Sequence, residues 1–191
     1  MKVVIITGSV RTGRQTQKAA QYLQKELEIR AIETAIIDLA EYSLPIMEER
    51  ISRNPEAPSA ALEISEKLKA ADAIVLVTPE YHGSFSGVLK NALDYFGPEF
   101  SKKVVGVVTV SGGRMGGINA SVQLQHVILS MGAFPLPQKL LVGEIQNAFD
   151  DALNPQTELL GKQAAKFIEE FTWFAEAIRV AKKITEKKEL V

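Results

Sequence analysis

The sequence contains no cysteine. This absence excludes disulfide bonds, cysteine-held zinc and iron–sulfur sites, and a thiol nucleophile. Histidine is almost as scarce: only His82 and His126 occur, without an H-E-x-x-H pattern, so a histidine-rich metal site is not expected. The chain therefore suits a chemistry that needs neither a thiol nor a protein-bound metal.

The sequence also lacks an excess of one charge and a long hydrophobic run. Lys and Arg number 22 against 23 Asp and Glu, so the net charge of −1 gives no general attraction to nucleic acid or to anionic membranes. The apolar run at the N-terminus ends at Thr7, which is too short for a signal peptide or a membrane span. We therefore expect a cytoplasmic protein with neither nucleic acid nor membrane as partner. With 46% hydrophobic residues, residues 1–191 are expected to form a single domain.

Continuous apolar runs alternate with segments of helical periodicity along the chain. The runs are uninterrupted and mostly β-branched, as in strands that are covered on both faces. This alternation predicts an α/β sandwich with a five-stranded parallel sheet. Strands are expected at 3–7, 31–39, 73–78, 103–110 and 134–143, and helices at 14–27, 59–71, 88–96, 118–131 and 155–183.

The sequence also predicts the location or burial of several individual residues in these elements. Pro135 and Pro137 cannot donate to a ladder, which places the fifth strand at a sheet edge. Leu62 is expected to face inward on the second helix, and Trp173 to be a core or interface residue on the last. The closing segment 182–190, KKITEKKEL, is expected to be a solvated tail.

Three loops are candidates for ligand binding. In parallel α/β sheets, ligands bind beyond the carboxyl ends of the strands. This rule points to the loops after the first, third and fourth strands, and all three are rich in Gly, Ser or Thr. Their sequences are GSVRTGRQT (8–16), PEYHGSFSG (79–87) and SGGRMGG (111–117).

The first loop has the composition of a phosphate site. Its glycines allow backbone N–H groups to approach a ligand closely, and the helix that follows offers free N–H donors and partial positive charge. Guanidinium and hydroxyl groups add further donors for phosphate oxygens. The alternative is a well-capped helix start with surface arginines. The polar residues concerned are Ser9, Arg11, Thr12, Arg14 and Thr16.

Two nucleotide-binding motifs are incomplete in this loop. Gly8 and Gly13 have the Walker A spacing, but Arg14 and Gln15 stand where that motif has Lys and Ser or Thr. A nucleotide hydrolase is therefore disfavoured. The G-x-G-x-x-G dinucleotide fingerprint is also missing, so Asp38, near the end of the second strand, is interpreted as a loop or cap residue.

The other two loops are suited to a flat ring. Their glycines, Gly83 and Gly87 in one and Gly112, Gly113, Gly116 and Gly117 in the other, allow the main chain to lie against a planar group. Tyr81 could stack on one face of such a ring. A monophosphate joined to a flat polar heterocycle corresponds to FMN.

The sequence resembles the NADPH-dependent FMN reductase family, which has a flavodoxin-like fold. The resemblance rests on GSVRTGR (8–14), PEYHGSFSGVLKNALDYF (79–96) and SGGRMGG (111–117), and the order of elements matches from Lys2 to about Gly143. It implies a three-layer sandwich with strand order 2-1-3-4-5. It also implies a homodimer or homotetramer, with the helix after Gly87 at a subunit contact. His82 departs from the family, which commonly has Asn after the Tyr of P-E-Y.

The resemblance also implies a set of FMN-binding residues. Those near the phosphate come from the first loop, and those along the ring from the other two. Arg114 is a candidate for stabilising the reduced ring or for binding the NADPH phosphate, and no protein side chain is expected to act as the catalyst. The expected set is Ser9, Arg11, Thr12, Gly13, Arg14, Gln15, Thr16, Pro79, Glu80, Tyr81, His82, Gly83, Ser84, Ser111, Gly112, Gly113 and Arg114.

The implied activity is that of an FMN-dependent NAD(P)H oxidoreductase. Hydride from NAD(P)H would reach FMN, and the electrons would pass to a quinone, flavin, azo or metal-oxyanion acceptor in a ping-pong cycle. The main alternative is a flavodoxin-type electron carrier without NAD(P)H activity. Such carriers are strongly acidic, whereas this chain has a net charge of −1 and two arginines in its first loop.

Overall fold

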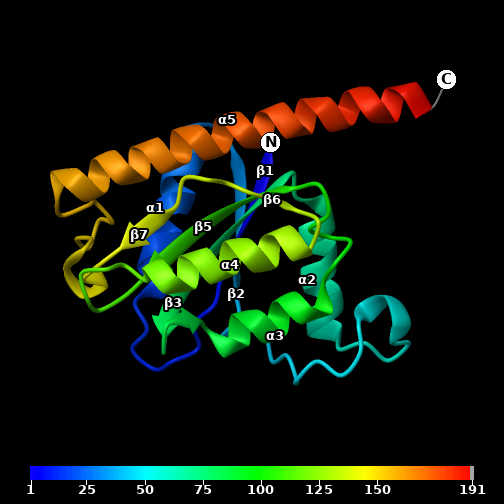
Figure 1. The fold of residues 1–191 in the computed structure, drawn as a ribbon, viewed down its shortest axis with the longest axis horizontal. Coiled ribbons are helices and arrows are strands. Elements are labelled where there is room, and N and C mark those ends of the chain that lie inside the picture. The colour runs from blue at the N-terminus through cyan, green and yellow to red at the C-terminus, as the bar shows by residue number, and fades with distance from the viewer. Residues whose placement is uncertain (190–191) are drawn as a thin grey trace.

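A parallel β-sheet lies at the centre of the structure, a computed structural model that describes residues 1–189, with side chains as far as Thr185 (Figure 1). The sheet order is β2-β1-β3-β5-β6, which confirms the flavodoxin-like order. That order reverses between β1 and β3, so the switch point lies at their carboxyl ends. The parallel strands are β1 (Lys2–Thr7), β2 (Glu33–Asp38), β3 (Ala73–Tyr81), β5 (Val104–Val110), β6 (Phe134–Pro135) and β7 (Leu140–Val142).

Helices cover both faces of the sheet. Val3 and Ile5 of β1 pack with α1 and α5, whereas Val4 and Ile6 pack with α2, α3 and α4. Because successive side chains of a strand point to opposite faces, burial of both faces explains the uninterrupted apolar runs. The helices are α1 (Thr16–Ile29), α2 (Ser59–Ala70), α3 (Gly87–Tyr95), α4 (Ile118–Ser130) and α5 (Glu158–Glu189), with short 3-10 helices at Ile51–Arg53 and Ile145–Asn147.

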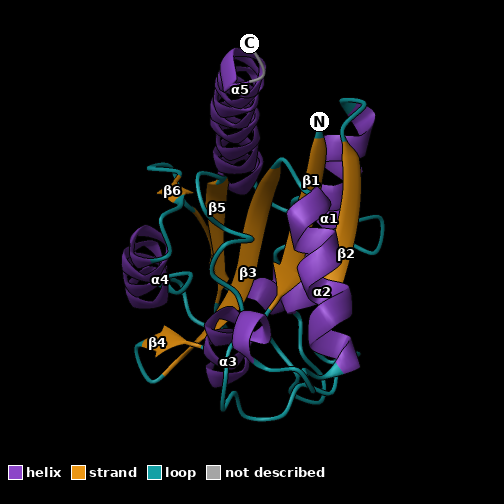
Figure 2. Ribbon diagram, turned by 90° about the vertical axis from the view of Figure 1, so that its right-hand side faces the viewer, coloured by secondary structure: helices purple, strands orange, loops and turns teal. Residues whose placement is uncertain are grey.

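Two strands differ from the sequence-based expectation. The predicted fifth strand is divided into β6 and β7, which both pair in parallel with β5 and are separated by the segment that contains Pro137. β3 is longer than expected, since it continues to Tyr81 and turns back into the antiparallel β4 (Ser84–Phe85). Figure 2 shows this hairpin beside α3 and α4.

One helical prediction was wrong at a single position, and another was wrong in its bounds. Leu62 is 46% exposed and does not join the core side of α2. α5 starts at Glu158 and continues to Glu189, past the predicted end at residue 183. The segment expected to be a solvated tail is therefore helical as far as Glu189, its side chains at 182–185 are exposed or partly exposed, and Leu190 lies outside the described residues. Over the described range, no helix combines the length and apolarity that a membrane span requires.

Lys103 is a buried cation at the start of β5. It is 7% exposed, and its ammonium group donates to the carbonyl oxygens of Leu68 and Lys69 in the last turn of α2. Burial lowers the pKa of Lys103 from 10.5 to about 8, with a smaller contribution from the charge of Lys182. Between about pH 8 and pH 10.5, the Lys103 side chain is therefore protonated to a greater extent in the unfolded chain than in the folded one.

We expect the free energy of unfolding to depend on pH through Lys103. Because the folded pKa is the lower one, stability from this group rises as pH increases from about 8 toward 10.5. In urea titrations, the stability of the wild type relative to Lys103→Met should rise by roughly 1–2 kcal/mol over this interval, a value reduced for residual hydration. A pH-independent difference would show that the two pKa values are alike.

Candidate functional site

The three predicted loops meet around one cavity of about 620 Å³. It lies at the carboxyl ends of β1, β3 and β5, as the topology requires. A fourth segment, which follows β7, closes the remaining side. The lining residues are Ser9, Arg11, Gly13, Arg14, Gln15, Thr16, Pro79, Glu80, Tyr81, Val110, Ser111, Gly112, Ile145 and Gln146.

Ser86 joins the first loop to the second. Its buried hydroxyl donates to the carbonyl oxygen of Gly8 and accepts from the backbone N–H of Leu89 at 3.3 Å, so it also caps α3. Its own N–H donates to the hydroxyl of Thr78 at 3.2 Å. Gly8 lies so close to α3 that an added Cβ would be 2.8 Å from the Cβ of Leu89. The first loop is therefore held directly against α3 and the end of β3.

The start of α1 is open to a ligand. No side chain caps this helix, and its first turn contains no acidic residue. Gly13 has a φ of +72° and no heavy atom within 4 Å of an added Cβ, so its backbone is accessible. Arg11 is exposed, and its side chain has no ion pair or hydrogen bond with any residue that the structure describes. Together, this helix start and Arg11 offer a phosphate group both backbone donors and a free positive charge.

Arg14 has a different role from Arg11, although both line the cavity. Its guanidinium donates to Asp38 at 2.5 Å, to the carbonyl oxygen of Ser9 at 3.1 Å and to Gln17 at 3.1 Å. The Arg14 and Asp38 side chains are only 20% and 15% exposed. Arg14 thus fixes the shape of the first loop. Asp38, interpreted from sequence as a loop or cap residue, is its ion-pair partner and also accepts from the N–H of Ala40.

The second loop places Tyr81 and Glu80 at the cavity. The hydroxyl of Tyr81 lies 3.4 Å from that of Ser9, so the two loops also touch at their polar side chains. The Glu80 carboxylate accepts from the N–H of Ala120 at 3.0 Å and from the side-chain amide of Asn119 at 3.4 Å. Glu80 therefore caps the N-terminus of α4, which carries no side-chain cap of its own.

His82 and Gly83 form the turn of the β3–β4 hairpin. Their φ angles of +51° and +77° are those of a two-residue type I′ turn. The side chain of Gln123 on α4 binds this turn, because it donates to the carbonyl oxygen of Gly83 at 2.8 Å and accepts from Ser84 at 2.7 Å. His82 is exposed and does not line the cavity. His82 therefore replaces the Asn that is common in the family with a residue that also tolerates the left-handed region of backbone conformation.

The third loop is open only at its beginning. An added Cβ would meet no heavy atom within 4 Å at Gly113, and at Gly112 only the side chain of Gln146, at 3.9 Å. Gly116 and Gly117 differ: both have positive φ, and an added Cβ would lie 2.8 Å from Leu141 or 2.9 Å from Thr109. The expectation that all the loop glycines face a flat ligand was therefore wrong for these two, which allow close packing.

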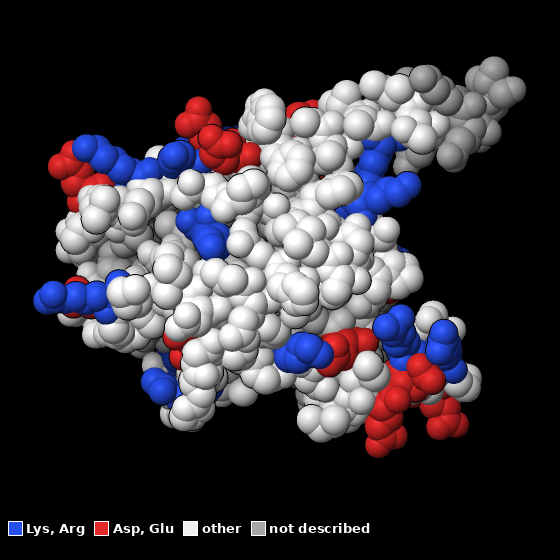
Figure 3. All heavy atoms as spheres, viewed as in Figure 1, with Lys and Arg blue, Asp and Glu red and all other residues white. Residues whose placement is uncertain are grey.

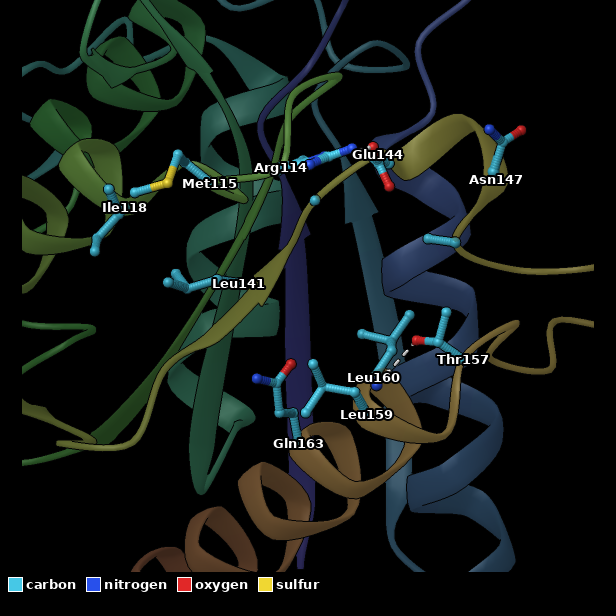
Figure 4. A pocket seen from close by; sticks show the side chains of 12 residues that line it. Arg114, Met115, Ile118, Leu141, Glu144, Asn147, Thr157, Leu159, Leu160 and Gln163 are labelled. Atoms are coloured by element: carbon cyan, nitrogen blue, oxygen red, sulfur yellow. Dashed lines mark hydrogen bonds and ion pairs between the residues drawn. The ribbon is translucent and has the colours of Figure 1, made fainter.

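Arg114 lies over a neighbouring hollow of about 530 Å³ (Figure 4). Its side chain is 89% exposed, and its Nε is 3.4 Å from the carboxylate of Glu144. Figure 4 shows Met115, Ile118, Leu141 and Leu159 around the same hollow. Segment 143–147 separates this hollow from the first cavity, so Arg114 does not line the cavity at the ends of β1 and β3.

Most of the predicted site residues lie together at the cavity, and some do not. Thr12, His82, Gly83, Ser84, Gly113 and Arg114 are outside its lining. Sequence reasoning missed three lining residues. Val110 is the last residue of a predicted strand, and Ile145 and Gln146 follow the strand that was predicted at the sheet edge. All three could have been found by the rule that ligands bind beyond the carboxyl ends of parallel strands. The missed residues are Val110, Ile145 and Gln146.

Comparison with known proteins decides the family. A profile of NADPH-dependent FMN reductases matches residues 1–147. The chain belongs to this family. An NADPH azoreductase of Bacillus sp. (strain OY1-2) is 35% identical over 173 residues, which cover 88% of this chain and 86% of that protein. An FMN-dependent NADPH-azoreductase of Staphylococcus haemolyticus is 38% identical over 130 residues, 66% and 67% of the two chains.

Solved structures agree with this assignment. The flavoenzyme NAD(P)H:(acceptor) oxidoreductase FerB of Paracoccus denitrificans superposes with a TM-score of 0.78 at 25% identity, over 92% of this chain and 97% of that one. A flavodoxin mutant of Pseudomonas aeruginosa superposes with a TM-score of 0.58 at 18% identity, over 94% of this chain and 99% of that one. This second likeness supports the fold alone. The protein is thus an NAD(P)H-dependent oxidoreductase with FMN as cofactor. The open start of α1 and the accessible backbone of Gly13 and Gly112 fit this cofactor.

Loss of the Ser86 hydroxyl should destabilise the fold and loosen the first loop of the cavity. Ser86→Ala removes a helix cap and leaves the Gly8 carbonyl without its buried donor, so we expect a loss of about 1–3 kcal/mol in urea unfolding. Ser59→Ala is the control, since Ser59 is an exposed first residue of α2. Equal losses in the two variants would show that the bridge does not stabilise the loops.

Substitutions of His82 should affect the turn and leave cofactor affinity unchanged. His82→Asn keeps a residue suited to positive φ, so both stability and FMN affinity should match the wild type. His82→Val should cost about 1–2 kcal/mol of stability because a β-branched residue is strained in this conformation. An FMN affinity that falls severalfold in His82→Asn would contradict this assignment, because it would place the imidazole in contact with the ligand.

Proposed function

We propose that the protein is a two-electron reductase that transfers electrons from NAD(P)H by way of FMN to a small-molecule acceptor. One observation supports this most: a single cavity joins an open helix start and an unpaired Arg11 to an aromatic and glycine-lined wall. When bound, FMN supplies the redox chemistry by accepting hydride and giving up two electrons. The side chains of the protein bind and orient the cofactor and shield one face of its ring.

The phosphate of FMN would lie at the first loop. The exposed guanidinium of Arg11, the N–H groups at the start of α1 and the hydroxyls of Ser9 and Thr16 are the donors that we assign to it. Arg14 would act indirectly, since its guanidinium is bonded to Asp38, Gln17 and the Ser9 carbonyl. Its bonds hold the backbone of the first loop in the shape that the phosphate requires.

The flavin ring would lie against the second and third loops. Pro79, Glu80 and Tyr81 form one wall, and Ser111 and Gly112 form the other. Ser111 is fixed by donation of its hydroxyl to the Gly113 carbonyl at 2.7 Å. The accessible backbone of Gly112 can therefore approach the edge of a planar group, and the ring of Tyr81 can cover part of its face.

The acceptor would use the same cleft as NAD(P)H. Shared occupancy of one cleft predicts ping-pong kinetics, in which NAD(P)+ leaves before the acceptor binds. Two relatives are named as NADPH azoreductases, and we therefore propose azo compounds as one acceptor class, alongside quinones, flavins and metal oxyanions. Reduction of such acceptors would need no protein nucleophile, because FMN, when bound, would supply the electrons.

A homodimer formed through α3 and α4 is part of this proposal. Met115, Val122 and Leu129 are 67%, 54% and 61% exposed on or next to α4. Figure 3 shows few charged side chains on the surface over this helix. A hollow between the β4 hairpin and α4, lined by Phe85 and Val127, adds to the same apolar surface. If this surface were buried against a second subunit, the β3–β4 hairpin of each subunit would lie close to the subunit contact.

The first test is a visible spectrum of the FMN-loaded protein, repeated under anaerobic conditions with NADPH or NADH. A flavin spectrum that bleaches in one rapid step supports a two-electron NAD(P)H reductase. A spectrum that resists both nucleotides would instead indicate an electron carrier. Absence of bound flavin would remove the cavity as the FMN site.

Removal of Arg11 should weaken FMN binding specifically. Arg11→Ala should lose roughly 1.5–3 kcal/mol of binding free energy, as expected for a charged hydrogen bond. Arg30→Ala is the matched control, because Arg30 follows the other end of α1 and pairs with Glu26. Flavin-fluorescence titration measures both affinities. If Arg11→Ala binds FMN as tightly as Arg30→Ala, Arg11 has no place in the phosphate site.

A further inference from the structure

Glu80 is the only acidic residue among the described residues that line the cavity at the ends of β1, β3 and β5. The same lining contains two cations, Arg11 and Arg14, and both come from the first loop. Arg14 is already ion-paired with Asp38. In the loaded protein, the phosphate of FMN would offset the charge of Arg11. The carboxylate of Glu80 then remains as an uncompensated charge on the wall that we assign to the flavin ring.

The carboxylate of Glu80 is held in place by the start of α4. Its Oε2 accepts from the backbone N–H of Ala120 at 3.0 Å, and its Oε1 accepts from the side-chain amide of Asn119 at 3.4 Å. Gly117 allows this approach, since an added Cβ would lie 3.4 Å from the Cβ of Glu80. The backbone of Glu80 is fixed as well, because it pairs with Phe85 in the β3–β4 hairpin. The charge therefore cannot turn away from the cavity without breaking these bonds.

The third loop brings no compensating cation to this wall. Its two residues in the lining, Ser111 and Gly112, are uncharged. Arg114, a candidate from sequence for stabilising the reduced ring, lies over the neighbouring hollow beside Glu144 (Figure 4). In the part of the chain that the structure describes, the ring walls of the cavity thus carry a negative side chain and no positive one.

Reduction by NAD(P)H changes the charge of the bound cofactor. The hydride that NAD(P)H gives up carries two electrons and one proton, so NAD(P)+ is formed and the flavin gains one negative charge. A fixed carboxylate nearby raises the free energy of this added charge, and it does so more strongly in a partly dry site than in water. A like charge disfavours the ionised form of an acid for the same reason.

We propose that Glu80 lowers the reduction potential of bound FMN and thereby makes the reduced cofactor a stronger reductant. This inference rests on the function proposed above, in which the ring lies against Pro79, Glu80 and Tyr81. Acceptors that resist reduction, such as azo compounds, benefit most from a low potential. In that step reduced FMN gives up two electrons and one proton, and the azo bond takes these up with one further proton from solvent to become a hydrazo group.

The test is the reduction potential of the FMN-loaded protein, measured in anaerobic equilibrium with a reference dye such as phenosafranin and with dithionite as reductant. Glu80→Gln keeps an oxygen for the N–H of Ala120 and removes the charge. The equilibrium constant for reduction of bound FMN by the reduced dye should increase about tenfold in this variant. Glu144→Gln is the matched control, since Glu144 is 57% exposed and lies outside the cavity lining. Equal constants in the two variants would overturn the proposal.

Asn119→Ala separates the charge of Glu80 from its function as a helix cap. This variant loses the longer of the two contacts but keeps the carboxylate and its bond to Ala120. The reduction potential should therefore remain that of the wild type. A potential that shifts as far in Asn119→Ala as in Glu80→Gln would assign the effect to the start of α4 and reject a role for the charge.

Gln146→Glu is an independent test that leaves Glu80 intact, and it decides the matter if Glu80→Gln fails to fold. Gln146 lines the cavity beside Gly112, where its side chain would be 3.9 Å from an added Cβ. A second carboxylate at this position should lower the same equilibrium constant severalfold. A constant that stays unchanged or rises would show that charge in the lining does not set the potential.

The affinity for FMN provides a second readout from the same samples. By thermodynamic linkage, a shift in potential equals the change in the ratio of the affinities for reduced and oxidised FMN. Glu80→Gln should therefore favour reduced over oxidised FMN about tenfold more than the wild type does. Because dithionite supplies the electrons, these measurements stand apart from turnover. A wild type that NAD(P)H fails to reduce would reject the proposed reductase, whereas the potentials alone decide the effect of Glu80.

Discussion

Parallel pairing of β1, β3 and β5 is the constraint on which the rest of this structure depends. Strands that run in one direction end at one edge of the sheet, and crossover helices return the chain along both faces. The faces are consequently dry, and polar side chains that would be costly there are concentrated at the carboxyl edge. The cavity at this edge is thus a place where arginine, serine and glycine residues come together.

This constraint explains why much of the site could be read from sequence. The loops after the strands were identifiable, and residues such as Ser9, Thr16 and Gly112 line the cavity as expected. The sequence could not show, however, which residues find a hydrogen-bond partner far along the chain. Arg14 looked equivalent to Arg11 until Asp38, 24 residues away, was seen to hold it, and Glu80 is committed to an N–H 40 residues away.

The glycines show the same limit in a different form. A glycine in the sequence shows that a position has no side chain, but it does not show whether a ligand or a neighbouring part of the protein occupies the space beside it. At Gly113 that space is open, whereas at Gly116 and Gly117 neighbouring strands fill it. The positive φ of His82 was hidden for a similar reason, since it follows from the pairing of β3 with β4, which a short apolar run does not reveal.

The bond between Ser86 and Gly8 spans 78 residues, and this separation bears on how the protein acquires its cofactor. Contacts between distant segments form late because loop closure must precede them. The shape of the first loop thus depends on the docking of β3 and α3 beside β1, and a chain in which these elements are not docked lacks the contact between Ser86 and Gly8. FMN therefore binds the finished fold and shifts the folding equilibrium toward it by mass action. Occupancy of the cavity and stability of the fold are in this way coupled, since a ligand that binds only the folded state stabilises that state.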